Sequence, residues 1–249
     1  MNRSILLFMV VSAIFSFVAT APAEAQSFVE TVKTGNIKNV KKLLGKKKTS
    51  INEQDSEGLT GLIVAVIAND STMADLLLGA GADPNIASRS GMTALHAAAF
   101  HSRDQVAPLL IASGANPNVF DSKGRSPLLV AATVGATNVV SALIQAGADI
   151  EYKDRKGNSA LMLACAGRHL GTQDELLEKG ANPNTRDLLG RTPAMLLCVL
   201  GEDEMLRILI KYKADLTLVD YSLKTALAYA KENRRKACIA ILEQAGTKY

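Results

Sequence analysis

The chain has 249 residues, of which 48% are hydrophobic and 21% are charged, and it contains no tryptophan. Its formal net charge of +4 is too small to indicate a nucleic-acid-binding protein on electrostatic grounds. Three cysteines are an odd number, which argues against a framework of disulfides. Composition therefore excludes a strongly basic protein and a disulfide-rich scaffold.

The first 25 residues have the form of an export signal. Arg3 provides a short basic start, an apolar stretch runs from Ile5 to Thr20, and AEA at 23–25 matches the small-x-small pattern of a cleavage site. A membrane anchor is the alternative, but the 16 residues of this stretch are fewer than the roughly 20 that span a bilayer. We expect cleavage after Ala25 and a mature protein that is periplasmic or secreted, without membrane contact.

Glycine then recurs at a fixed interval of 33 residues in two separate series. The first series consists of Gly81, Gly114, Gly147 and Gly180. The second consists of Gly58, Gly91, Gly124, Gly157 and Gly190, and each is followed two residues later by threonine or serine. Two independent series with one period establish an internal repeat.

Each repeat predicts two short helices. In residues 88–120, a glycine turn precedes a helix-forming run from Thr93, a polar break lies near Ser102, and a second run ends before Gly114. Pro108 lies inside this second run and predicts a kink or a late helix start. Helices of about nine residues are shorter than the roughly 12–15 needed for independent stability. Each pair must therefore bury its apolar face against the next pair.

The stretches GMTALHAA at 91–98 and GANPN at 114–118 resemble the signature of ankyrin repeats, a family with a 33-residue period. The resemblance implies an all-α repeat solenoid of helix-turn-helix units joined by hairpin loops. It also implies that His96 makes a structural hydrogen bond between neighbouring turns. The predicted domain contains an N-terminal capping unit, 26–54, a C-terminal capping unit, 220–249, and five full repeats between them: 55–87, 88–120, 121–153, 154–186 and 187–219.

Two charge runs coincide with the predicted capping units. They are Lys46-Lys47-Lys48 in the first unit and Arg234-Arg235-Lys236 in the last. The end of a stack must face water, so we interpret these runs as features of the caps. Nucleic-acid or targeting patches are the alternative.

No arrangement of residues predicts catalysis. His101 and His169 fall at different places in different repeats and form no zinc cluster, and the common motifs of hydrolases and phosphate sites are absent from the sequence. Cys165 and Cys198 occupy equivalent helix positions about 8–10 Å apart, beyond the roughly 7 Å that a disulfide bridges. Cys238 aligns with apolar core positions. We expect three buried free thiols, no cofactor, no metal and no enzymatic activity.

The function must then lie in a surface, and the resemblance implies the hairpin tips and the inner face of the first helices. The predicted partner-binding residues occupy those positions: Arg89, Met92, Phe100, His101, Phe120, Lys123, Arg125, Arg155, Arg186, Leu188, Leu189, Arg191, Val199, Leu200 and Tyr221. Aromatic residues beside arginines are typical of interface hot spots, although several of the apolar side chains could instead pack on their neighbours. Because basic residues crowd the central tips, we expect a protein partner with an acidic surface patch, and a chain that is monomeric by itself.

The leading hypothesis is a non-catalytic protein-binding module of the periplasm. The resemblance extends to exported bacterial ankyrin proteins of similar size and layout, which implies an inhibitor or a self-protection (immunity) protein that caps a cell-wall hydrolase. Two alternatives remain. One is a periplasmic stress or structural factor that supports another enzyme, and the other is a secreted effector that binds a host protein.

Overall fold

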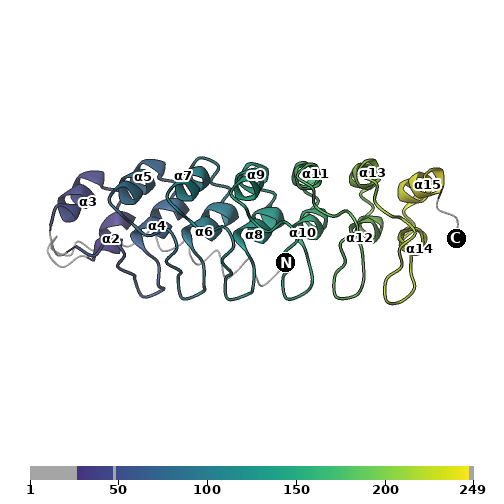
Figure 1. Ribbon diagram of the computed structural model, residues 1–249, viewed down its shortest axis with the longest axis horizontal. Coiled ribbons are helices and arrows are strands. Elements are labelled where there is room, and N and C mark those ends of the chain that lie inside the picture. Colours follow the sequence, from purple (N-terminus) through teal and green to yellow (C-terminus); the bar gives the residue numbers. More distant parts are fainter. Residues whose placement is uncertain (1–26, 47–48, 247–249) are drawn as a thin grey trace.

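The computed structural model describes residues 27–46 and 49–246, which form a row of seven helix pairs arranged in two layers (Figure 1). The predicted export signal lies outside the described residues. The first helices of the pairs are α2 (Phe28–Lys33), α4 (Gly61–Ile67), α6 (Ala94–Phe100), α8 (Pro127–Val134), α10 (Ala160–Ala166), α12 (Pro193–Leu200) and α14 (Ala226–Glu232). The second helices are α3 (Ile37–Leu44), α5 (Ser71–Gly79), α7 (Val106–Ala112), α9 (Thr137–Gln145), α11 (Leu170–Glu178), α13 (Asp203–Lys211) and α15 (Lys236–Gln244). The predicted all-α repeat solenoid is confirmed.

Every first helix begins at a serine or threonine N-cap. Thr60 and Thr225 illustrate the start, since each side-chain oxygen accepts the backbone N–H three residues further on, at 3.2 Å in both cases. The threonine and serine residues that follow the recurring glycines are therefore N-caps. In the described part of the chain, no strand is present beyond one isolated bridge between Gln54 and Thr60, and no helix has the length and apolar character needed to cross a bilayer.

The core runs through the whole row without interruption. The repeated leucine of the second helix is fully buried in every pair from α5 onward: Leu77, Leu110, Leu143, Leu176, Leu209 and Leu242. Each first helix packs on the first helices before and after it, and the second helices from α5 onward do the same. Stability therefore comes from contacts between neighbouring repeats rather than from any single unit.

His96 performs the structural role that was expected of it. It is buried, its Nδ1 lies 3.0 Å from Thr93 Oγ1, and its Nε2 lies 2.9 Å from the backbone oxygen of Arg125 in the next repeat. Burial lowers the pKa of this imidazole below its usual 6.5, so it remains neutral near neutral pH. The histidine therefore joins two repeats and offers no free base for chemistry.

The recurring GANPN phrase joins one repeat to the next. Asn85 Oδ1 accepts the backbone N–H of Asn116 at 2.7 Å, and its Nδ2 donates to the Gly114 oxygen at 3.0 Å. Asn118 makes the same pair of bonds to Asp149 and Gly147 one repeat later, both at 2.9 Å. The phrase recurs because each copy satisfies backbone groups of the following copy.

Helix α7 starts two residues late compared with its equivalents. Helices α5 and α9 begin at Ser71 and Thr137, which would place the start of α7 at residue 104, but α7 begins at Val106. Pro108 then lies in the first turn of the helix, where a missing backbone N–H is tolerated. The prediction of a late start is confirmed.

The fourth full repeat has polar residues at two core positions. Thr172 and Gln173 are buried, whereas the residues aligned with Thr172 in the neighbouring repeats are Val139 and Met205. Thr172 Oγ1 lies 2.7 Å from Thr137 Oγ1, and Gln173 Nε2 donates to the Met205 oxygen at 2.9 Å. Side-chain hydrogen bonds therefore supplement apolar packing around α11.

The charge run at the C-terminal cap also takes part in packing. Arg235 Nε donates to the Val199 oxygen at 3.1 Å, at the end of α12 in the preceding repeat. Arg103 and His169 occupy equivalent positions and reach the Ile67 and Thr133 oxygens in the same way. This run thus contains a structural residue within a capping unit.

Candidate partner-binding surface

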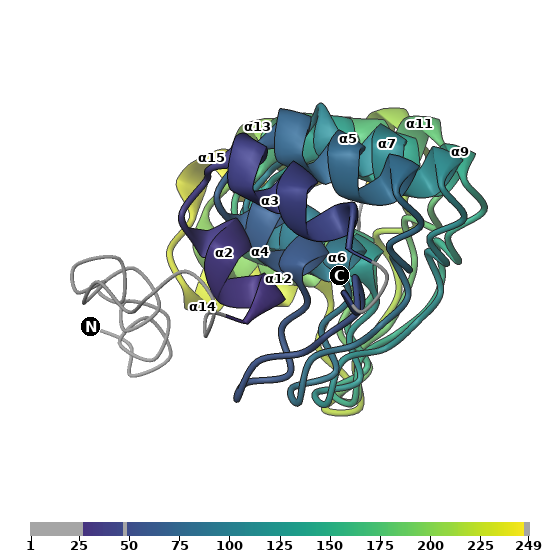
Figure 2. The ribbon, with the colours of Figure 1, turned by 90° about the vertical axis from the view of Figure 1, so that its left-hand side faces the viewer.

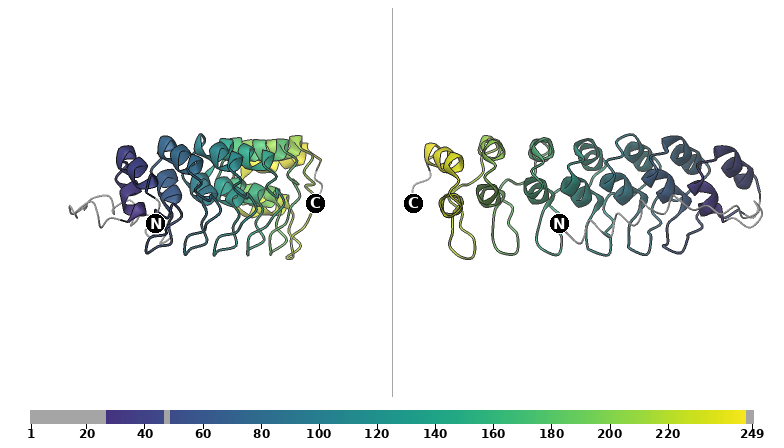
Figure 3. Two further views of the ribbon diagram at one scale, coloured as in Figure 1. Left: turned by 60° about the vertical axis from the view of Figure 1, so that its left-hand side comes forward. Right: turned by 180° about the vertical axis from the view of Figure 1, so that it is seen from behind.

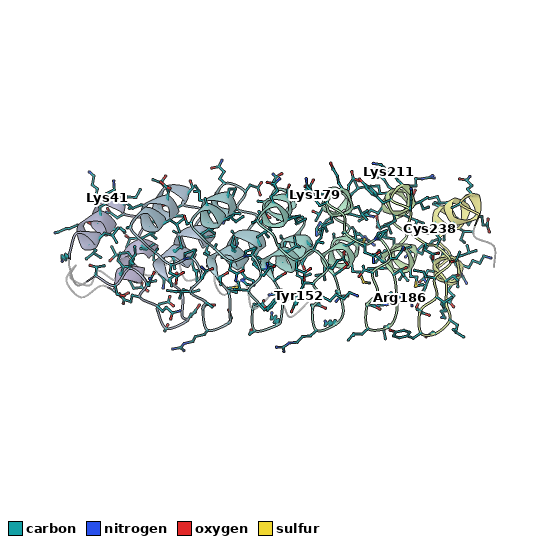
Figure 4. All side chains as sticks on the ribbon, viewed as in Figure 1. Lys41, Tyr152, Lys179, Arg186, Lys211 and Cys238 are labelled. Atoms are coloured by element: carbon teal, nitrogen blue, oxygen red, sulfur yellow. The ribbon has the colours of Figure 1, made fainter. Side chains whose placement is uncertain are left out.

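The hairpins between successive helix pairs all project on the same side of the row, beyond the first helices (Figures 2 and 3). We call their ends the tip ridge and define it by six four-residue tips: 55–58, 88–91, 121–124, 154–157, 187–190 and 220–223. Figure 4 shows Tyr152 and Arg186 in this hairpin layer, whereas Lys41, Lys179 and Lys211 lie along the second helices. The ridge therefore forms one edge of the molecule.

A side-chain acceptor that is buried or half-buried closes each tip. Asp121 Oδ1 accepts the backbone N–H groups of Lys123 and Arg125, each at 2.9 Å. An aspartate makes the same two bonds in the first, fourth, fifth and sixth tips, and in the second tip Ser88 Oγ accepts from Met92 at 3.2 Å. These acceptors were not among the predicted residues, although their 33-residue spacing is visible in the sequence.

Four of the five neighbouring pairs of tips are also joined by a backbone hydrogen bond. Arg89 N–H donates to the Glu57 oxygen at 3.0 Å, Ser122 N–H to the Ser90 oxygen at 2.9 Å, and Tyr221 N–H to the Leu189 oxygen at 3.1 Å. The tip glycines permit this approach, because a Cβ on Gly91 would lie only 2.8 Å from Ser122 N. The ridge is consequently an ordered row rather than a set of independent loops.

The outward side chains change character along the ridge. The first tip presents Ser56 and Glu57, and the second presents Arg89. Basic side chains continue in the third and fourth tips, and the fifth and sixth tips are mainly apolar. The exposed basic residues are Arg89, Lys123, Arg155 and Lys156, and the exposed apolar ones are Leu188, Leu189, Tyr221 and Leu223.

Four of the predicted apolar contact residues are exposed. Phe120 is 49% exposed and stacks on Tyr152 with ring centroids 4.3 Å apart, while Leu188, Leu189 and Tyr221 are 64%, 58% and 73% exposed. Among the other predicted residues, Arg89, Lys123 and Arg155 are exposed side chains of the ridge, and Met92 and Arg186 are half-buried. Whether these residues contact a partner remains a prediction.

Phe100, Val199 and Leu200, which were predicted to contact the partner, are less accessible than the exposed residues of the ridge. All three are half-buried at the ends of their first helices. Phe100 packs against the core and meets the His101 ring edge-on at 5.0 Å, and His101 is itself half-buried. At Val199 and Leu200, the side chain of Arg235 from the next repeat crosses the helix end. The repeat pattern does not reveal such coverage, because it depends on one side chain of the neighbouring repeat.

Arg125 and Arg191 were expected to contact the partner, but each is engaged within its own hairpin. Arg125 Nη2 lies 2.7 Å from Asp121 Oδ2, and Arg191 Nη2 lies 2.7 Å from Asp187 Oδ2. The side chains of the two aspartates are only 3% exposed. These arginines hold the tip shape, so the basic charge available to a partner comes from the other tip residues.

Leu223 is an exposed residue that the sequence analysis missed. It is 81% exposed and takes the position that glycine occupies in the other five tips. The glycine series stops at Gly190, and continuing the same count by 33 reaches this leucine. The break in the series was therefore the available signal.

The remaining groups capable of chemistry are separated or buried. Within residues 27–46 and 49–246, no group of three or more histidine, cysteine, aspartate or glutamate side chains could hold a metal ion. Cys165, Cys198 and Cys238 are buried free thiols, as predicted. Burial raises the pKa of all three, and the neighbouring Cys238 adds to the effect at Cys198.

We expect the native protein to resist thiol reagents. The thiolate is the reactive form, and burial both suppresses it and blocks access. Incubation with iodoacetamide followed by mass spectrometry should show no alkylation of the native chain and three alkyl groups after denaturation in urea. A Ser122→Cys variant, which places a thiol on an exposed tip, is the positive control. Rapid native alkylation at any of the three cysteines would contradict the expected burial.

Comparison with known proteins agrees with this architecture. A family model described as ankyrin repeats matches in three copies, over residues 28–121, 105–187 and 174–249. Among solved structures, the chain is similar to the ankyrin repeat domain of Bcl-3, described as a unique member of the IkappaB protein family. The TM-score is 0.78 and the sequence identity 28%, and the match covers 88% of this chain and 98% of that chain.

No curated protein matches the chain in a sequence search. The family model nevertheless spans nearly all of the described residues, and its fold is typically a non-enzymatic scaffold that binds other proteins. The chain therefore belongs to the ankyrin repeat family.

Proposed function

We propose that this protein is a periplasmic binding module that caps a cell-wall hydrolase and inhibits it, as a self-protection protein would. The observation that carries the proposal is the tip ridge, in which hydrogen-bonded hairpins hold exposed basic and apolar side chains in a fixed row. A rigid surface of this kind loses little conformational freedom on binding, which favours affinity.

The location outside the cytoplasm is supported by the N-terminal sequence alone. Residues 1–25 have the basic start, apolar stretch and small-residue cleavage site of an export signal. Inhibition by capping would require no chemistry from this chain, because the ridge would cover the catalytic cleft and exclude the substrate. Residues that could have served a reaction are used otherwise, as the repeat-joining role of His96 illustrates.

Affinity capture tests the proposal. The mature chain should retain a cell-wall hydrolase from an extracytoplasmic fraction, whereas a Phe120→Ala, Leu188→Ala, Tyr221→Ala triple variant should lose it. All three side chains are exposed, so the variant is expected to fold, which circular dichroism can verify. Equal capture by both forms would place the interface elsewhere.

An activity assay on the captured enzyme then separates inhibition from support. Purified mature chain should lower the rate of peptidoglycan hydrolysis in proportion to the complex formed. An unchanged or increased rate would contradict inhibition and favour a supporting role. Detection of the uncleaved chain in a host cytosol would instead contradict the periplasmic assignment.

A further inference from the structure

Leu223 has a backbone conformation that its residue type does not favour. Its φ is 62°, in the left-handed region, where the other five tips use glycine. A residue with a Cβ is disfavoured in this region, and among the described non-glycine residues with positive φ Leu223 is the only apolar one. Its side chain is 81% exposed, so burial within its own chain does not compensate. Backbone strain of this kind is found preferentially at functional positions.

Three further exposed apolar side chains lie in the fifth and sixth tips, the same two tips that end at Gly190 and Leu223. Tyr221 lies over Gly190, where an added Cβ would come within 2.9 Å of the Tyr221 ring. The backbone bond from Tyr221 to Leu189 then fixes the two tips relative to each other. Leu188 completes the set. The result is a rigid exposed apolar cluster, which on a folded protein usually marks an interaction site.

The tips that precede this cluster carry positive charge. Lys123, Arg155 and Lys156 are exposed, and Arg155 is held in place because its side chain lies over Gly124. Asp121 and Asp154 in the same tips are engaged by backbone N–H groups, so they do not offer free negative charge to a ligand. From its second tip onward the ridge therefore has a direction, with three basic tips followed by two apolar tips.

We propose that the tip ridge binds an extended acidic segment of a partner protein, and that apolar residues at one end of this segment cover Leu188, Leu189, Tyr221 and Leu223. The inference rests on the proposed binding function and specifies the partner's chemistry. Four intervals of roughly 8–10 Å separate the second tip from the sixth. An extended segment of about 12 residues is long enough to span this distance. Carboxylates would face the basic tips, where charge complementarity also fixes the direction of the segment.

A second copy of this chain does not have the required chemistry. In a two-fold dimer with antiparallel ridges, the third tip of one copy would face the fourth tip of the other, and Lys123 would oppose Arg155 and Lys156. With parallel ridges, each basic tip would face the same basic tip of the other molecule. Like charges directly opposed at an interface are destabilising, so a different and acidic partner fits better.

Selection from a phage-displayed library of random linear peptides of about 16 residues tests this inference. We expect enriched sequences in which carboxylates and apolar residues occupy opposite ends, in one order. One such synthetic peptide should then bind Leu223→Gly about tenfold more weakly than the wild type, although this variant should unfold at higher urea concentration because the strain is removed. An Arg155→Ala, Lys156→Ala variant should also bind more weakly, with a reduced dependence on salt.

Ser102→Gly is the matched control, because Ser102 also has positive φ and is exposed but lies between α6 and α7, away from the ridge. It should be stabilised without any change in peptide affinity. The inference would be overturned if no peptides are enriched, or if the enriched peptides lack the acidic and apolar pattern. Equal binding of the peptide by the wild type and Leu223→Gly would also overturn it. Displacement of the peptide by a single-stranded DNA of about 20 nucleotides would overturn it in favour of a nucleic acid.

Failure of this inference and failure of the proposed function give different results. If the hydrolase is captured equally by the wild type and Leu223→Gly, the proposed function stands and the inference fails. If the peptides bind as described but no hydrolase is captured, the inference stands and the proposed function fails.

Discussion

The Asp121→Ala variant should unfold with a free energy about 2–4 kcal/mol lower than that of the wild type. Asp121 Oδ1 accepts two backbone N–H groups at 2.9 Å, and Oδ2 accepts Arg125 Nε at 2.9 Å and Nη2 at 2.7 Å. The aspartate side chain is only 3% exposed, so its removal leaves these donors without an acceptor in a place that water reaches poorly. Urea titration, monitored by the circular dichroism of the helices at about 222 nm, measures the difference in free energy of unfolding.

Asp121→Ser is the control that the chain itself provides, because Ser88 closes the second tip with one hydroxyl bond. This variant should lose about half as much stability as Asp121→Ala. An equal loss in the two variants would show that the acceptor bonds contribute little.

The stability difference should also depend on pH. Burial alone would raise the pKa of Asp121, but the hydrogen bonds and positive charge from Arg125 hold the pKa below its usual 3.8. A carboxyl with a lowered folded-state pKa adds stability that is present above the unfolded pKa and is lost as pH falls through the folded one. The difference in free energy of unfolding between the wild type and Asp121→Ala should therefore become smaller below about pH 4. If this difference stays constant from about pH 7 to pH 3, the ionised carboxylate is not the source of the stability.

The repeat period predicts the fold well because it specifies which residues are equivalent. Once His96, Pro108 and the recurring leucines are aligned by the 33-residue count, the helix caps, the core positions and the late start of α7 follow from local chemistry. These features depend on contacts that every repeat makes in the same way. Sequence reasoning is most reliable for such features.

The candidate surface is less predictable because it depends on residues that break the pattern. Arg125 is drawn to Asp121 within its own hairpin, and Arg235 crosses the end of α12, so neither role can be inferred from an average repeat. Leu223 shows the opposite case, in which one substitution in the glycine series creates the most exposed large apolar side chain of the described residues.

A Gly91→Ala variant should be destabilised by about 2–4 kcal/mol, the other large effect that we expect. Gly91 has a φ of 77°, and an added Cβ would lie 2.8 Å from Ser122 N and 3.0 Å from the Cα of Asp121. Both contacts are to backbone, so no side-chain rotation can relieve them. The second and third tips would have to separate, which would break the 2.9 Å bond from Ser122 N–H to the Ser90 oxygen.

Gly114→Ala isolates the contribution of tip packing, because Gly114 has nearly the same φ, 83°, but no atom within 4 Å of the position of an added Cβ. This variant carries the left-handed strain alone and should lose only about 1 kcal/mol. Urea unfolding of the two variants side by side gives the difference. If that difference is near zero, the tips are not rigidly packed, and the ridge does not present a fixed row of side chains. If it is large, the 33-residue period maintains the tip ridge of the molecule as well as its core.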